Sequence, residues 1–466
     1  MDITEPEKVE KWVVKTFGAV ECGDPRRTDR LIKVAKALAS NPSASLPCAL
    51  ETWGETLGAY RLLANPAITY EQIISAHWSQ TYHEATQSSR TLLLADITEM
   101  DYSTHKAVKG LAPIGNSRED VGFSLHTVLA MNPQTEQLLG CLTQEPFLRK
   151  LAPERETKAQ RQKRERESHV WARSVQHIGR VPANCQWVYV ADSGSDIYTF
   201  WQTCEDLGYD FALRVAQDRV IEIAPEDALE DCDEKYLKTL ARALPATAAR
   251  FLSVPAHEHQ PKREVFLQMS FQKVHIQPPV HGDCLRKADL VAWVIRVWET
   301  DPPQGQEPLE WILLTTVPIL SPADAWEVVQ WYRWRWILED FHKALKTGCR
   351  IEQRFLQSVE ALWKLVAILT PIALRLLLIR QAAQQAEEIP AAQVVSQDVV
   401  RVVIHLDPRH REIVTAKQLW HAIARLGGYL DRSCDGPPGW QTLWKGWIRV
   451  MYTLEGVHFA LHFSSS

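Results

Sequence analysis

Three acidic residues occur where two strands and a helix could bring carboxylates together. Asp96 and Asp192 each follow an apolar run that is typical of a buried strand, residues 91–95 and 187–191. Adjacent carboxylates repel each other unless a cation binds them, so two neighbouring strand ends of this kind would favour a metal ion. A single Asp at a strand end is more often a cap or turn residue, and the hypothesis therefore needs a third ligand.

The third candidate is Glu339, in a segment over residues 323–346 whose apolar residues follow helical spacing. At about 100° per residue, one stripe of this helix carries the lone glutamate with a tyrosine and several basic side chains: Tyr332, Arg335, His342, Lys343 and Lys346. Apolar residues occupy the opposite side, which could pack on a sheet. A solvated face of salt bridges is the alternative interpretation of the same stripe.

Three convergent carboxylates are typical of sites that cleave phosphodiester bonds. They can bind two Mg²⁺ or Mn²⁺ ions about 3.5–4 Å apart, one activating water or a 3′-hydroxyl and the other stabilising the leaving oxygen. Hard oxygen ligands favour these ions over zinc. Arg and Lys side chains nearby would bind phosphate groups. The predicted cofactor is therefore Mg²⁺ or Mn²⁺, with two ions per active site.

The composition is that of a globular protein. The 466 residues are 45% hydrophobic and 23% charged, with a formal net charge of −5, which indicates about two to four domains or one large decorated core. No apolar stretch reaches the roughly 20 uncharged residues of a membrane span, and the charged N-terminus lacks a signal-peptide core. The 9 cysteines form no CxxC pair. We therefore expect a cytoplasmic protein with reduced thiols and no structural zinc site. Local basic patches, rather than the net charge, would decide nucleic-acid binding.

The spacing of apolar residues changes along the chain. Helical spacing predominates up to about residue 85 and again over residues 323–346, 359–386 and 416–456. The polar stretch 152–170 favours a solvated helix, with a DNA-contact helix as the alternative. Strands are expected at residues 91–96, 122–131, 136–143 and 187–192, and in a strand-rich region at 211–215, 264–276, 289–298 and 311–316.

The spacing Tyr332-x2-Arg335-x3-Glu339-x6-Lys346 resembles the Tyr-Arg-Glu-Lys signature of the DDE transposases of the insertion-sequence-four family. Residues 23–28 (GDPRRT) and 58–61 (GAYR) resemble the N-terminal DNA-binding region of that family. Residues 424–428 (ARLGG), followed by several tryptophans, resemble its C-terminal region. The resemblance therefore extends nearly from one end of the chain to the other.

The resemblance implies an α/β fold with a ribonuclease H-like mixed-sheet core, a β-rich insertion, and helical domains on either side. It implies an N-terminal DNA-binding domain at residues 1–75, a catalytic domain at 76–370 with the insertion at about 210–318, and a dimerisation domain at 371–466. The implied partners are double-stranded DNA, as transposon ends and target, and a second copy of the chain in the DNA complex. The expected location is the bacterial cytoplasm, with association to the nucleoid through DNA.

The resemblance also implies roles for individual residues. Asp96, Asp192 and Glu339 would be the catalytic metal ligands, and Trp311 would stack on a flipped base during hairpin formation. A buried core tryptophan is the alternative for Trp311, because apolar residues follow it. The remaining candidates would contact DNA or its phosphates: Tyr332, Arg335, His342, Lys343 and Lys346 near the catalytic helix, and Arg26, Arg27, Arg30 and Arg61 near the N-terminus.

Three functions remain compatible with the sequence. The favoured one is an active cut-and-paste DDE transposase that nicks DNA, forms and resolves hairpins, and transfers strands to a target. The second is a catalytically silent DNA-binding regulatory derivative of a transposase, which the presence of all three acids does not favour. The third is a nuclease or resolvase on the same fold, which binding to transposon ends and strand transfer would exclude.

Overall fold

The chain forms two compact units. The computed structural model describes residues 6–464 except 116–118, 152, 154, 158–165, 225–233, 255–262, 280–288, 304, 386–388, 408, 410–411, 433–434 and 436–437. The first unit comprises Met1–Thr81, Thr98–Ser124 and Glu339–Ser466, and the second comprises Tyr82–Ile97 and Leu125–Leu338. Much of the polar helix predicted at 152–170 lies outside the described residues.

Helices make up most of the first unit, and short polar caps begin two of them. The Asp24 carboxylate accepts a hydrogen bond from the Arg26 N–H at the start of α2 (2.9 Å), and the Thr52 hydroxyl accepts one at the start of α4. The predicted N-terminal helices are thereby confirmed. The helices are α1 (Pro6–Phe17), α2 (Pro25–Ser40), α3 (Leu46–Ala49), α4 (Trp53–Ala64), α5 (Tyr70–Ala85), α11 (Ile337–Lys343), α12 (Val359–Gln385), α13 (Ala391–Val394), α14 (Gln397–Leu406), α15 (Ala416–Leu426) and α16 (Trp440–Ser464).

The long helix α12 is the centre of the first unit. It packs against α2 and α4, and its segment Val359–Leu378 is apolar and long enough to cross a membrane by composition alone. However, 83% of that segment is buried inside the protein, which is typical of a core helix. The ammonium group of the buried Lys364 donates hydrogen bonds to the carbonyls of Leu63 (3.1 Å) and Asn65 (2.7 Å), so α12 also caps the end of α4.

The second unit is built on a mixed sheet. Its strands lie in the order β3-β1-β5-β6-β11-β10-β9-β7, with β4 beside β3 and β8 beside β9, and the short β2 (Ala112–Pro113) pairs with the start of β3 in the first unit. Strands β1, β5 and β6 are parallel, whereas β6, β11, β10 and β9 are antiparallel. The bounds are β1 (Arg90–Asp101), β3 (Val121–Asn132), β4 (Gln137–Phe147), β5 (Gln186–Ala191), β6 (Asp210–Arg214), β7 (Ile221–Glu222), β8 (Ala248–Val254), β9 (Arg263–Ile276), β10 (Leu290–Glu299) and β11 (Glu310–Thr315).

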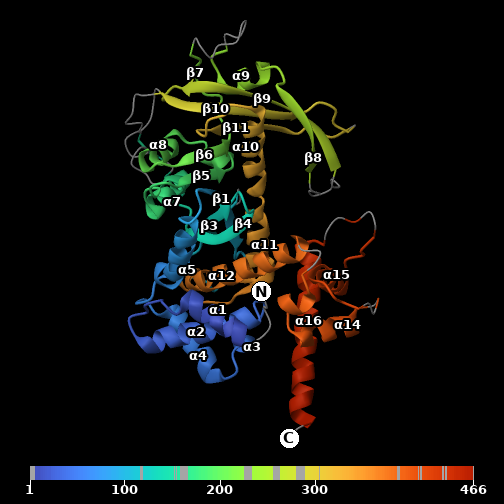
Figure 1. The fold of residues 1–466 in the computed structure, drawn as a ribbon. Coiled ribbons are helices and arrows are strands. Elements are labelled where there is room, and N and C mark those ends of the chain that lie inside the picture. Colours follow the sequence, from blue (N-terminus) through green and yellow to red (C-terminus); the bar gives the residue numbers. More distant parts are fainter. Residues whose placement is uncertain are drawn as a thin grey trace. The chain divides into compact units, whose positions relative to one another are not determined.

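This topology confirms the mixed α/β architecture and locates the predicted insertion strands. The strand-rich region was expected to form an insertion, and its strands continue the same sheet as β1 and β5 through the pairing of β6 with β11 (Figure 1). Since β6 and β11 pair directly, the region from β6 to β11 is hydrogen-bonded to the strands that carry the first two acidic candidates.

The two faces of the sheet are covered by different helices. The alternating residues Leu93, Tyr189, Phe211 and Ile312 belong to one buried core together with α7 (Val170–Ile178), α8 (Tyr198–Leu207) and α9 (Leu237–Ala243). Helix α10 (Pro322–Trp334) packs against β5 and β6, and its Tyr332 contacts Trp311, which alternates with Ile312 along β11. Because successive side chains of a strand point to opposite faces, α10 covers the other face.

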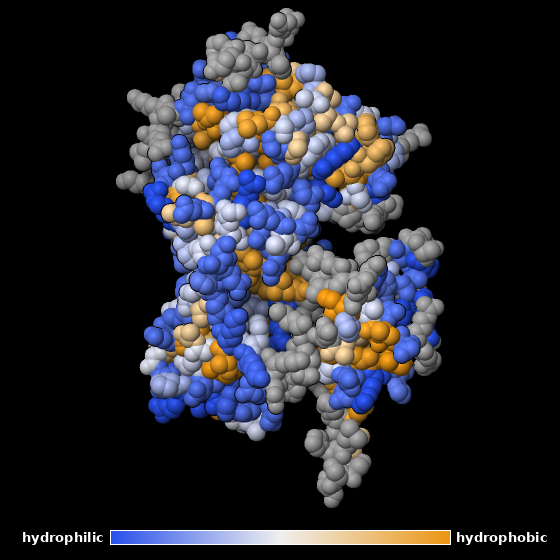
Figure 2. Space-filling view, viewed as in Figure 1, coloured by the Kyte–Doolittle hydropathy of each residue, from blue (hydrophilic) through white to orange (hydrophobic). Residues whose placement is uncertain are grey.

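The surface that Figure 2 displays is mostly hydrophilic, with hydrophobic patches. On β8 and β9, Phe251 and Phe266 are directly opposite in register, and their ring centroids are 5.1 Å apart. The side chains are 69% and 39% exposed. The outer face of this hairpin therefore carries an aromatic pair in contact with solvent.

The first strand is longer than the sequence predicts. The predicted strand ends at Asp96, but β1 continues to Asp101. Ile97 and Thr98 follow Asp96 directly, and β-branched residues favour extended backbone. Asp96 therefore lies within a strand, whereas Asp192 follows β5 as predicted.

The predicted helix over residues 323–346 is interrupted. After α10 the backbone makes i→i+3 hydrogen bonds, from the Trp336 N–H to the Arg333 carbonyl and from the Leu338 N–H to the Arg335 carbonyl. A π-helical turn, Ala344–Gly348, follows α11. The prediction of one regular helix was wrong, because a wheel of 100° per residue does not hold across tighter and wider turns.

A buried histidine provides a test of this core. His126 on β3 is fully buried, its ring packs edge-on against Trp171, and burial lowers its pKa to about 3. The unfolded chain binds a proton below about pH 6.5 that the folded protein does not. We expect this histidine to reduce the free energy of unfolding by about 1.4 kcal/mol per pH unit as the pH falls below 6.5. Denaturant unfolding between pH 7 and pH 4 measures this slope, and His126→Gln should decrease it; an unchanged slope would contradict the assignment.

Candidate active site

Asp96 and Asp192 occupy equivalent positions of two neighbouring parallel strands. The last pair of the β1–β5 ladder is Leu94 opposite Val190, and each of the two aspartates lies two residues after its member of this pair. Because the side-chain period of a strand is two, both acids point to the face of Leu94 and Val190. That face is the one covered by α10. The structure therefore confirms that the two strands leading to these acids are parallel neighbours, and it leaves both acids at the same end of the ladder.

Both carboxylates are held by hydrogen bonds. Asp96 Oδ1 accepts from the Ile97 N–H (2.9 Å), and Asp96 Oδ2 forms an ion pair with Arg335 Nη1 (2.8 Å). Asp192 Oδ1 accepts from the Gly194 N–H (2.9 Å) and caps a short 3-10 turn. A Cβ at position 194 would lie 3.1 Å from Asp192 Oδ1, so a side chain there would crowd the carboxylate. Glycine thus permits this close backbone approach.

The loop after Asp192 is fixed by a second aspartate that the sequence analysis did not assign a role. Asp196 is 2% exposed, pairs with Arg219 (2.8 Å), and accepts hydrogen bonds from the N–H groups of Ala216 and Gln217 (2.7 Å each). The Arg219 guanidinium also lies 4.4 Å from the ring centroid of Trp201. The spacing of Asp192 and Asp196 in the sequence contained no signal that distinguished the half-buried Asp192 from the buried Asp196.

Tyr332 and Trp311 lie on the same face as the two acids. Their ring centroids are 5.7 Å apart, and the side chains are 4% and 7% exposed. The Arg335 guanidinium lies 5.7 Å from the Tyr332 ring centroid. The burial of Trp311 agrees with the alternative of a core tryptophan, so stacking on a flipped base would require a rearrangement around this ring.

The predicted site residues from Glu339 onward, on α11 and the π-helical turn after it, belong to the first unit. Glu339 is half exposed and forms an ion pair with Lys343 at 4.0 Å, as the i,i+4 spacing allows. Lys346 donates to the Glu99 carbonyl (2.5 Å) and pairs with Glu352 (3.2 Å). His342 is buried. Lys346 therefore has structural partners within its own unit. Its role as a phosphate contact stays a prediction.

The donor set can be compared with the needs of a divalent cation. No cluster of three or more His, Cys, Asp or Glu side chains suited to an ion occurs in the part of the chain that the structure describes. Asp96 and Asp192 provide two hard oxygen ligands, each two residues beyond the last pair of adjacent parallel strands. Mg²⁺ is commonly bound by one or two carboxylates together with water and substrate phosphates. The pair fits such an ion, whereas the contribution of Glu339 stays a prediction.

The N-terminal arginines differ in their surroundings. Arg26 is exposed and pairs with Asp24 (2.9 Å), and Arg61 is exposed in the last turn of α4. Arg27 donates to the Cys22 carbonyl (3.2 Å). Arg30 packs so closely over Gly58 that a Cβ there would lie 2.7 Å from its guanidinium carbon. Arg26 and Arg61 are thus the more accessible of the four predicted DNA contacts.

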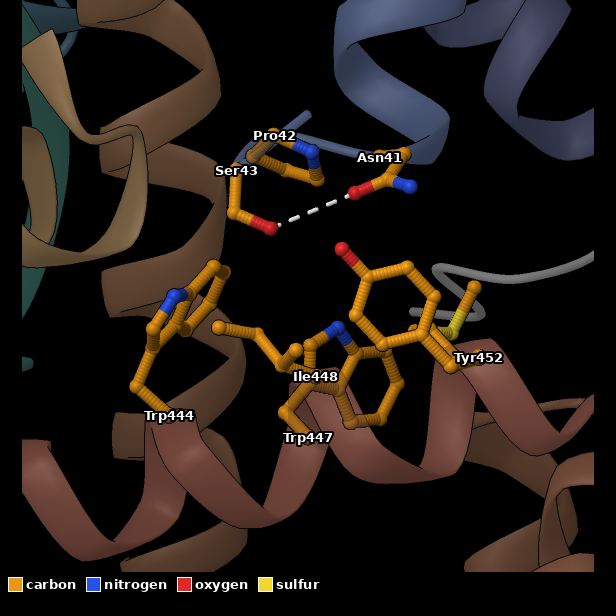
Figure 3. Close-up of a pocket in the computed structure, with 8 residues that line it drawn as sticks. Asn41, Pro42, Ser43, Trp444, Trp447, Ile448 and Tyr452 are labelled. Carbon is orange, nitrogen blue, oxygen red and sulfur yellow. Dashed lines mark hydrogen bonds between the residues drawn. The ribbon is translucent and has the colours of Figure 1, made fainter. Parts of the chain in front are cut away.

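A small cavity in the first unit lies apart from the predicted carboxylates. It lies between the turn after α2 and aromatic residues of α16 (Figure 3). The Ser43 hydroxyl donates to Asn41 Oδ1 at 3.3 Å. None of the predicted acids lines the cavity, so we do not assign it to catalysis. The lining residues are Asn41, Pro42, Ser43, Trp444, Trp447, Ile448, Met451 and Tyr452.

Comparison with known proteins finds a family match for the N-terminal helices. Residues 9–68 match the family model described as transposase DNA-binding, which covers α2 to α4 and most of α1. Among solved structures, the cryo-EM synaptic complex of piggyBac transposase with hairpin DNA is similar over 96% of this chain and 85% of that chain, with 9% identity and a TM-score of 0.36. A TM-score of this size does not establish a shared fold. The family match supports a DNA-binding transposase as the class of protein.

The exposed arginine of α4 allows a test of this DNA-binding region. Each phosphate contact releases counterions, so Arg61→Ala should weaken binding to all DNA sequences and lower the salt slope of log affinity by about one. Fluorescence anisotropy over a range of salt concentrations measures this slope. Lys36→Ala is the control, because Lys36 on α2 pairs with Glu10 (2.5 Å) and should leave the slope unchanged. An Arg61→Ala slope equal to that of the wild type would exclude a phosphate contact.

Proposed function

We propose that this chain is a cut-and-paste DNA transposase of the insertion-sequence-four family, of the same kind as the transposase of the bacterial transposon Tn five. It would bind the ends of its transposon, nick the DNA, form and resolve hairpin ends, and transfer the freed strands into target DNA. Two copies of the chain would act together on paired ends, with the C-terminal helical region as the dimerisation element.

The observation that carries this proposal is that Asp96 and Asp192 each follow, by two residues, a paired position of two parallel strands, in a chain whose residues 9–68 match the transposase DNA-binding family. Carboxylates that lie close together repel each other unless a cation binds them, and the Arg335 guanidinium already provides one positive charge at Asp96. Helix α10 lies over the same face, and Arg335 and Tyr332 come from its end. The signature spacing from Tyr332 to Lys346 supports Glu339 as the third ligand.

Asp96, Asp192 and Glu339 are the residues that would hold two Mg²⁺ or Mn²⁺ ions. When bound, such ions activate the attacking water or 3′-hydroxyl and stabilise the leaving oxygen. The protein's own contribution is to fix the acids: the Gly194 N–H holds Asp192, and the Ile97 N–H holds Asp96. Preorganised ligands of this kind reduce the cost of orienting the reacting groups.

One departure from the Tn five enzyme concerns the residues after the second Asp. That enzyme has Arg-Glu there, whereas this chain has Ser193 and Gly194. The close contact of the Gly194 N–H with Asp192 leaves little room for a side chain at that position. We therefore propose that phosphate contacts of the Arg-Glu pair are made by other residues in this protein, with Arg335, at the C-terminal end of α10, as a candidate.

Incubation with Mg²⁺ and DNA from the flanks of its own reading frame tests the proposal. The expected products on a denaturing gel are nicked ends, then hairpin ends, then strand-transfer products. Binding without any cleavage would instead support the silent regulatory derivative. Cleavage without specificity for those ends would support a nuclease on the same fold.

A further inference from the structure

The side chain of Arg335 has a specific partner in this structure. Its Nη1 lies 2.8 Å from Asp96 Oδ2, and the two side chains are only 11% and 18% exposed. The other carboxylate oxygen of Asp96 accepts from the Ile97 N–H. Both oxygens of the first proposed ligand are therefore already engaged by donors of the chain.

The backbone directs Arg335 to this place. Helix α10 begins at a capping box formed by Ser321 and Asp324 and ends at Trp334, so that Arg335 is the C-cap residue. The Tyr332 ring lies 5.7 Å from the guanidinium carbon. An arginine held at the end of a capped helix, over a buried ring and beside a carboxylate, is well ordered before any ligand binds.

A divalent cation at Asp96 would meet this arginine directly. The cation needs the same oxygen lone pairs, and it would also be repelled by the positive charge at close range. A guanidinium can exchange a carboxylate for a phosphate, because both present paired oxygens to its N–H groups. The DNA backbone thus offers Arg335 an alternative partner of the same geometry.

We infer that Arg335 blocks Asp96 in the protein alone and releases it only when a DNA phosphate accepts the guanidinium, so that cation binding follows DNA binding. This inference rests on the proposed function, since it takes Asp96 as a metal ligand. Such coupling would keep a phosphodiester-cleaving site from loading its cations away from DNA. Arg335 is a positioning residue in this role, because it acts through Asp96.

Isothermal calorimetry with Mn²⁺ and the full-length protein without DNA tests the inference. The Arg335→Gln variant should bind Mn²⁺ about tenfold more tightly than the wild type, because it lacks the competing ion pair and its positive charge. Arg333→Gln is the matched control, because Arg333 lies on α10 and donates to Gln330 (2.7 Å) and to the Ser253 carbonyl (3.0 Å). It removes the same charge two residues away and should bind Mn²⁺ as the wild type does.

The outcomes separate the inference from the proposed function. Equal Mn²⁺ affinity of Arg335→Gln and the wild type would overturn the inference, as would an equal gain in Arg333→Gln, which would indicate a general charge effect. Adding Asp96→Asn to Arg335→Gln should abolish the gain. If the double variant still binds tightly, the cation does not use Asp96, and the inference fails. The proposed function is tested separately by cleavage of end DNA with Mg²⁺.

Discussion

Asp192→Ala is expected to bind transposon-end DNA with nearly wild-type affinity and to lose nicking and strand transfer. The loss should be at least about a hundredfold, because residues that only orient a metal ligand already cost roughly 10–100-fold when changed. Asp96→Ala and Glu339→Ala should behave in the same way, since the remaining acids would not hold both ions. Gel-shift and cleavage assays on the same end DNA measure the two properties.

Asp101→Ala is the control for the change in Asp96. Asp101 lies on the same strand and accepts hydrogen bonds from the N–H and hydroxyl of Ser103 (2.8 and 2.6 Å). The Asp101→Ala variant removes the same charge from β1 at a position that belongs to the first unit, and cleavage should remain near that of the wild type. Wild-type cleavage by Asp192→Ala would show that Asp192 is not a metal ligand.

Trp311→Ala is expected to destabilise the protein and to reduce nicking and hairpin formation together. The side chain is 7% exposed and packs against Tyr332, and truncation of a buried tryptophan costs about 3–5 kcal/mol of the free energy of unfolding. Denaturant unfolding, run beside a gel that resolves nicked from hairpin DNA, measures both effects. The large cavity left by the ring is the physical reason for the expected loss.

The same experiment tests the predicted stacking of Trp311 on a flipped base. A base that leaves the duplex needs a receiving ring, and stacking on that ring returns roughly 1–3 kcal/mol. If Trp311 has this role, the alanine variant should nick the first strand nearly normally and stall before the hairpin. Trp311→Phe, which keeps a ring and most of the packing, should then restore hairpin formation.

Several features of the sequence were sufficient to predict the local structure. The apolar runs before Asp96 and Asp192 predicted two buried strands, and the structure confirms both, together with their adjacency. An alternating apolar pattern indicates a strand with one buried face, and a continuous apolar run indicates a strand buried on both faces. The end of the first strand was missed, because the residues after Asp96 are half exposed and no longer follow an apolar run.

The sequence by itself determined which residues could carry the chemistry: the acids Asp96, Asp192 and Glu339, and the basic residues of the signature. It also determined the N-terminal helices, since their caps and apolar spacing are local. The tertiary structure alone decided what each side chain contacts. Three contacts show this: Arg335 pairs with Asp96, Trp311 packs against Tyr332, and Asp196 pairs with Arg219. In each contact the two residues are far apart along the chain. Such contacts depend on strand register and on interruptions of helices, which residue spacing does not record.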